Sequence, residues 1–68
     1  MKITYDEQED ILLINFNDDP IIRDISLNWY VNIGFTEEGL GEISILEAKK
    51  IGLLPLYVQP NENLLKVA

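Results

Sequence analysis

The sequence predicts an α+β fold: an antiparallel β-meander of four to five strands, one short helix packed on the sheet, and an apolar C-terminal extension. Two observations carry this prediction. Short apolar segments are separated by polar turn signals, which is typical of antiparallel strands, and the alternation is almost perfect over Trp29–Phe35. In addition, Ser44 and Glu47 have capping-box spacing, and Gly52 follows as a stop signal, so a helix is expected between them.

The first two strands are expected to form a hairpin. Residues Lys2–Tyr5 alternate, and residues Ile11–Phe16 are apolar on both faces. Between them lies an acidic turn that holds Asp6, Glu7, Glu9 and Asp10. A strand that is apolar on both faces needs cover on both, so the second strand should lie inside the sheet or at a subunit contact.

The third and fourth strands follow the turn Asn17–Pro20. The third, Ile21–Leu27, alternates less cleanly than the fourth. The fourth is expected to bury one face and leave the other in water; the buried face holds Trp29, Val31, Ile33 and Phe35. No Gly or Pro separates the two segments, so they form either one long bent strand or a hairpin that turns near Leu27-Asn28.

A tight turn at Thr36–Gly39 leads into the segment Leu40–Leu46, in which Ile43 and Ile45 share a face. The expected helix begins near Ile45 and runs to Ile51. Gly52 ends it and Pro55 prevents continuation. This helix should lay its apolar side chains, Ala48 and Ile51, on the sheet.

Residues 1–52 are therefore expected to form the meander and helix, and residues 53–68 an extension packed on the same domain or on a neighbouring subunit. Pro55 makes Leu53–Val58 an edge strand or an extended segment. Residues 60–63 read as a loop, and the last apolar side chains are Leu64, Leu65 and Val67.

Composition limits the function. Sixty-eight residues without Cys or His have neither disulfide nor structural zinc to supplement a small core, so we expect a homo-oligomer. With 12 acidic and 5 basic residues the net charge is −7, which disfavours nucleic acids and anionic membranes and favours a basic protein partner. The simpler interpretation of that charge is a solubilising surface. The absence of Cys and of long apolar runs predicts a cytoplasmic protein.

No residue is predicted to be catalytic, cofactor-binding or metal-binding. Without His and Cys there is no imidazole base and no thiolate nucleophile, Ser26 and Ser44 lack a nucleophile motif, and the four glycines form no phosphate-binding loop. We therefore expect no enzyme and no cofactor. A pairing of either serine with Lys49 or Lys50 is conceivable, but nothing in the sequence singles it out.

Two clusters of acidic residues are candidate cation ligands. The acidic turn at residues 6–10 could supply oxygen ligands, but it lacks a calcium-loop spacing, and a hairpin turn normally holds solvated charges. The group Asn17, Asp18 and Asp19 is explained by one turn before Pro20. A small-ligand or divalent-cation binding module remains the alternative function.

The aromatic residues are expected to divide between core and surface. Trp29 and Phe35 lie on the regular apolar face, which favours packing over base stacking. Tyr30 lies on the polar register with Asn28 and Asn32, and an exposed Tyr between amides is suited to a protein contact.

Ordered motifs also carry a family resemblance. Met1-Lys-Ile-Thr-Tyr-Asp6, Asp10-Ile-Leu-Leu-Ile14, Glu38-Gly39 and Ile43-Ser-Ile-Leu-Glu-Ala48 are similar to the pattern of the small bacterial proteins of domain-of-unknown-function family 2283. The resemblance covers roughly residues 1–50. Ser44 stands where that family usually has Glu, the stretch after Gly39 is one residue short, and residues 53–68 lie outside the pattern.

This resemblance implies a β-meander closed by a short helix, and it supplies no activity. Some members are encoded beside small toxin-like proteins, which implies an antitoxin-like role by association only. The sequence therefore predicts a small acidic, non-catalytic protein-interaction module, in which the acidic surface would mask a basic partner.

Overall fold

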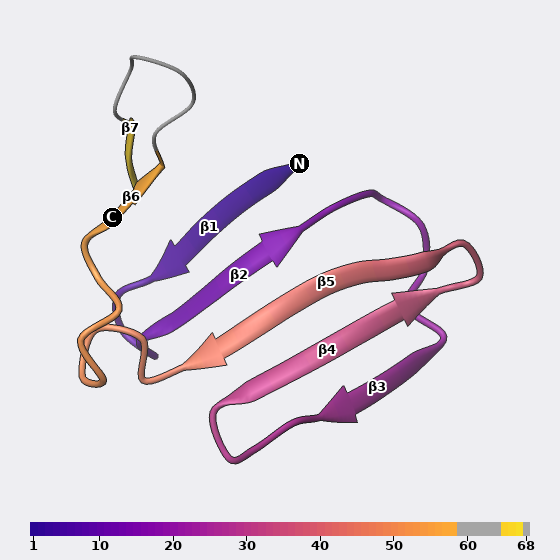
Figure 1. Ribbon diagram of the computed structural model, residues 1–68, viewed down its shortest axis with the longest axis horizontal. Helices are drawn as coiled ribbons and strands as arrows, with labels where there is room; N and C mark the ends of the chain where they lie inside the picture. Colours follow the sequence, from indigo (N-terminus) through magenta and orange to yellow (C-terminus); the bar gives the residue numbers. More distant parts are fainter. Residues whose placement is uncertain (59–64, 68) are drawn as a thin grey trace.

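The computed structural model describes residues 1–58 and 65–67, and its main feature is one antiparallel sheet of five strands in the order β1-β2-β5-β4-β3 (Figure 1). The strands of this sheet are β1 (Lys2–Asp6), β2 (Ile11–Asn15), β3 (Arg23–Ser26), β4 (Val31–Thr36) and β5 (Gly39–Leu46). A second sheet pairs β6 (Leu56–Val58) with β7 (Leu65–Val67).

The described part of the chain is all-β, so the α+β prediction is wrong. Where the helix was expected, β5 continues to Leu46, and Ser44 lies in the ladder opposite Leu13 and Asn32 instead of capping a helix. Residues 47–52 form a turn with one helix-like hydrogen bond, from Ile51 N to Glu47 O at 2.9 Å.

The physical reason lies at the two ends of this turn. Glu47 has a φ of +52°, a left-handed conformation that separates the strand from the turn. Gly52, with a φ of +85°, ends the turn after six residues, and a single helical turn has not recovered the entropy of its own nucleation. The predicted stop at Gly52 is thus present, but it ends a turn. Ala48 is fully buried as expected, whereas Ile51 is 40% exposed.

The strand order departs from a simple meander. The strands β3, β4 and β5 lie side by side in chain order, whereas the β1-β2 hairpin pairs through β2 with the free side of β5. The doubly apolar β2 therefore lies inside the sheet, between β1 and β5. Of the two alternatives for the third and fourth segments, the hairpin is present. Asn28 closes it by accepting bonds from the amides of Tyr30 (2.9 Å) and Val31 (2.8 Å) through Oδ1.

The connection from β2 to β3 is held against the sheet by Ile21. A β-bulge at Gly41 leaves Gly34 paired with Glu42 and Phe35 paired with Leu40. A Cβ on Gly41 would lie 2.7 Å from Ile21 Cδ1, and one on Gly34 would lie 3.1 Å from Ile21 Cγ2. The two glycines therefore provide the space that the Ile21 side chain occupies.

The structure describes only part of the predicted C-terminal extension. Leu53–Val58 was expected to be an edge strand or extended segment, and its last three residues form β6, an outer strand of the two-stranded sheet. The expected loop at residues 60–63 and the packing of Leu64, Leu65 and Val67 lie outside what the structure describes.

Candidate interaction surface

The five-stranded sheet has two chemically different faces. Antiparallel partners share a face, and neighbours along a strand alternate between faces, so the register assigns every strand residue. One face is almost entirely apolar, and we call it the apolar face. Its members are Ile3, Tyr5, Leu12, Ile14, Arg23, Ile25, Val31, Ile33, Phe35, Leu40, Ile43 and Ile45.

The apolar face is poorly covered. Leu12 is its only fully buried member, and Leu40 and Ile25 are 42% and 41% exposed. No helix lies over it in residues 1–58, and the turn at 47–52 is tied to one end of the sheet, where the Ala48 amide donates to Asp10 O at 3.1 Å. An apolar sheet face is stable in water only against another layer.

The only charged residue on the apolar face is Arg23. Its guanidinium lies 4.8 Å from the centroid of the Phe35 ring, its cross-strand partner. This stacking covers part of the ring at the β3 edge. The carboxylates of the sheet lie elsewhere, on the opposite face or in the turns.

The opposite face, which we call the polar face, can remain in water. Its strand residues are Lys2, Thr4, Asp6, Ile11, Leu13, Asn15, Asp24, Ser26, Asn32, Gly34, Thr36, Glu42, Ser44 and Leu46. A cross-strand hydrogen bond from Asn32 Nδ2 to Asp24 Oδ1, at 3.0 Å, lies on it. Thr36 is buried, with 4% exposed, beside Gly41 and the Ile21 side chain.

The aromatic predictions have a mixed outcome. Phe35 lies on the apolar face and is half-buried, as expected. The prediction for Trp29 is wrong: it lies in the β3-β4 turn and is 63% exposed, because the strand begins only at Val31. Tyr30 is half-buried, and its ring meets that of Trp29 edge-on, with the centroids 5.0 Å apart. The amide of Asn28 serves the turn rather than flanking a contact site.

The acidic turn contains a structural clamp. Asp10, with a φ of +55°, accepts bonds through Oδ1 from Tyr5 Oη (2.7 Å) and the Lys49 amide (2.8 Å), and through Oδ2 from the Lys50 amide (3.2 Å). A residue of one hairpin thus caps a turn that lies 39 positions later in the chain. Asp6 acts locally, accepting bonds from the amides of Gln8 and Glu9 at 3.0 and 3.1 Å.

These bonds shift two ionisation equilibria. The hydrogen bond from the Lys49 amide is the main reason why the pKa of Asp10 lies below its ordinary value. The same carboxylate raises the pKa of Tyr5 to about 12, chiefly because the protonated phenol donates a hydrogen bond to Asp10. The two shifts have one cause, a charged carboxylate held by donors, so Asp10 is engaged in folding contacts.

No group of three or more acidic side chains in residues 1–58 is arranged to hold a metal ion. Asp6 binds amides of its own turn, whereas Asp10 binds amides of the turn at 47–52. In the other candidate group, Asn17 Oδ1 accepts a hydrogen bond from the Asp19 amide at 3.0 Å, which closes the expected turn before Pro20. The structure therefore offers no geometry in favour of the cation-binding alternative.

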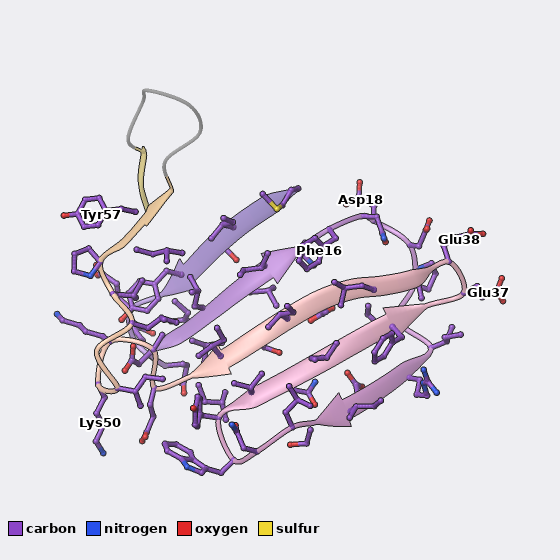
Figure 2. The ribbon with its side chains drawn as sticks, in the orientation of Figure 1. Phe16, Asp18, Glu37, Glu38, Lys50 and Tyr57 are labelled. Atoms are coloured by element: carbon purple, nitrogen blue, oxygen red, sulfur yellow. The ribbon has the colours of Figure 1, made fainter. Side chains whose placement is uncertain are left out.

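Acidic side chains do gather at one end of the sheet. Figure 2 shows Asp18, Glu37 and Glu38 together at the end opposite Lys50. A hollow of about 280 Å³ lies at this end, and we call it the acidic hollow; it is lined by Asp19, Pro20, Ile22, Glu37 and Glu38. Ile22 is 61% exposed, so the hollow combines an apolar floor with carboxylates.

The sequence did not reveal the acidic hollow. Its residues come from two turns that are far apart in the chain, and only the β2-β3 connection brings them together. The separate turn signals at Asn17–Pro20 and Thr36–Gly39 were visible, but their meeting depends on the strand order. Within the described residues the one ion pair is Lys50 Nζ to Glu47 Oε1, at 3.6 Å and at the other end.

The described residues contain no helix of the length and apolarity required to cross a bilayer. A family model described as "Protein of unknown function (DUF2283)" matches residues 2–49, which is most of the chain and all five strands of the main sheet. Neither the search of curated proteins nor that of solved structures yields a match.

Proposed function

The chain belongs to the DUF2283 family of proteins of unknown function, and we propose that it is a non-catalytic module that binds a protein partner through the acidic hollow. The observation that carries this proposal is the meeting of two acidic turns around Pro20 and Ile22. Carboxylates beside an exposed apolar side chain form a surface that is suited to bind a Lys or Arg side chain of a partner.

The fit is one of shape and charge together. Lys and Arg place an aliphatic stem on apolar surface while the charged head stays near water or an anion. Here Ile22 and Pro20 would receive the stem, and Glu37 and Glu38 the head. A volume of about 280 Å³ is suited to a side chain or two rather than to a large ligand.

The overall charge of −7 supports the same partner class, because it attracts a basic protein at long range and repels nucleic acid. The finer form of the proposal is an antitoxin-like inhibitor, in which the acidic hollow masks a basic surface of a toxin-like protein encoded beside this chain. That form depends on the family resemblance together with the charge.

The test is co-expression with the protein encoded beside this chain, followed by affinity measurements at about 0.05 M and about 0.5 M salt. A complex that weakens with salt is expected. Glu37→Lys/Glu38→Lys should weaken it by about tenfold or more. Glu7→Lys/Glu9→Lys, which makes the same change in net charge on the β1-β2 turn, should have a much smaller effect. Equal effects of both pairs, or no salt-sensitive complex, would reject the proposal.

A further inference from the structure

The strongest unexplained feature is the open apolar face. A compact monomer of 7.8 kDa is expected to expose about 4,400 Å² by surface scaling, whereas this chain exposes 5104 Å². The excess of about 700 Å² is close to the about 800 Å² that each partner buries in a standard-size protein interface. Part of this excess lies on the apolar face, where Leu40 and Ile25 are 42% and 41% exposed, and part on the β6-β7 hairpin, which lies apart from the five-stranded sheet (Figure 1).

The occupant can be identified by charge. The apolar face has no carboxylate, and its one cation, Arg23, lies at the β3 edge against Phe35. Two copies, each with a charge of −7, can therefore bring this face together while their acidic turns stay at the rim. A basic partner would find its complement on the acidic hollow, and the apolar face offers it none.

Geometry supports the same occupant. Two sheets pack face to face at about 10 Å with interdigitated side chains, and a face that packs on its own copy satisfies two-fold symmetry. Association through a sheet edge is less favourable, because both edge strands carry charged residues: β3 begins with Arg23 and Asp24, and β1 begins with Lys2 and ends with Asp6. The face of the sheet, and not its edge, is the surface that needs cover.

We propose that the apolar face is the interface of a homodimer in which two copies of this sheet form a β-sandwich. The chain has no disulfide, and the described residues hold no metal cluster, so the second copy supplies the missing layer of the core. The proposal goes beyond the binding of a basic partner and is independent of it, since the acidic hollow lies at the end of the sheet.

Sedimentation equilibrium of the full chain tests this directly. The expected mass is twice 7.8 kDa, and the dimer should not weaken between about 0.05 M and about 0.5 M salt, because apolar contact is insensitive to screening. A single-chain mass at millimolar concentration would overturn the proposal. The salt response separates it from the proposed function, whose complex weakens with salt and depends on Glu37 and Glu38.

A matched pair of leucines on β5 tests which face is used. Leu40 on the apolar face and Leu46 on the polar face are 42% and 40% exposed. Leu40→Lys should weaken the dimer by about tenfold or more, and Leu46→Lys by less than about twofold. The reverse order, or equal effects, would show that another surface is used.

Circular dichroism will show whether Leu40→Lys keeps its strands. If it does not, the milder pair Leu40→Ala and Leu46→Ala gives the same comparison without a new charge. Leu40→Ala should then weaken the dimer about threefold to tenfold, with Leu46→Ala near wild type. Equal dimer affinities for these two variants would reject the assignment of the face.

Discussion

The two faces of the five-stranded sheet differ in chemistry although they share the same strands. The apolar face has twelve strand residues, among which there is no carboxylate and a single cation, whereas the polar face mixes amides, hydroxyls and acids with three apolar side chains, Ile11, Leu13 and Leu46. Yet most residues of both faces are half-buried or exposed within one chain. The comparison teaches that the two faces differ in what can cover them: water can solvate most of the polar face, whereas the apolar face is the one that the proposed second copy would cover.

The first prediction compares neighbouring leucines on β2. Leu12, on the apolar face, is fully buried, and Leu13, on the polar face, is half-buried. Leu12→Ala should lower the free energy of unfolding by about 2–5 kcal/mol, which is most of what a domain of this size has. Leu13→Ala should cost about 1 kcal/mol. Urea unfolding followed by circular dichroism, at one protein concentration, measures both; similar losses would contradict the assignment of the faces.

The second prediction concerns the small packed site on the polar face. A Cβ at position 41 would lie 2.7 Å from both Ile21 Cδ1 and Thr36 Cγ2, so Gly41→Ala should cost about 1–3 kcal/mol of unfolding free energy. Truncating Ile21 removes one of the two clashes. The double variant Gly41→Ala/Ile21→Ala should therefore be more stable than the sum of the single effects, by about 1 kcal/mol. Strict additivity would show that Ile21 does not occupy this space.

The third prediction concerns the clamp that closes one end of the apolar face. Because the pKa of Asp10 is lower in the folded chain, its stabilisation is present above the unfolded value, about 3.9, and is lost as pH falls through the folded value. Asp10→Asn loses the charge and the acceptor for the Lys50 amide. This variant should melt several degrees lower than the wild type at pH 7. Its melting temperature should also fall less steeply as the pH is lowered, which thermal unfolding at a series of pH values measures.

The alkaline limb tests the other partner of the clamp. The pKa of Tyr5 is raised to about 12, so its contribution is present below its usual value near 10 and is lost as pH rises toward 12. Tyr5→Phe should flatten this limb. Glu9→Gln, in the same turn, is the control and should leave the pH dependence of the melting temperature unchanged at both the acid and the alkaline end. Equal melting temperatures for Glu9→Gln and Asp10→Asn at every pH would contradict the role assigned to Asp10.

The smallest effect is expected at Trp29. It is 63% exposed in the β3-β4 turn, so Trp29→Ala should change the unfolding free energy by less than about 0.5 kcal/mol. Phe35 is half-buried on the apolar face, so Phe35→Ala should lower the free energy of unfolding by about 2 kcal/mol. A larger loss at Trp29 than at Phe35 would favour the register expected from the sequence.

The strands themselves were predictable because their signals are local. Alternation placed Val31, Ile33 and Phe35 on one face, and the same pattern joined Ile43 to Ile45; the register confirms both groups. The doubly apolar β2 was expected inside the sheet or at a subunit contact, and the structure places it inside the sheet. The alternation was extended too far at Trp29, because Asn28 closes the turn through its side chain and delays the strand to Val31.

Neither the turn that replaces the expected helix nor the acidic hollow was predictable, because both depend on distant contacts. The turn at 47–52 has a helix-like sequence, and a residue from the first hairpin holds it in place: Asp10 accepts hydrogen bonds from the amides of Lys49 and Lys50. The acidic hollow likewise needs the β2-β3 connection to bring Glu37 and Glu38 to Ile22. No local pattern contains either pairing.

The reaction rate of a single introduced cysteine is the most direct test of the proposal that a second copy of the chain covers the apolar face. The chain has no cysteine, so Leu40→Cys and Leu46→Cys each introduce one thiol, on opposite faces of β5 and with similar exposure in the single chain. We predict that, as protein concentration rises through the dimerisation range, the thiol at position 40 reacts about tenfold more slowly with a maleimide while that at position 46 keeps its rate. Equal rates at the two positions at every concentration would contradict the account.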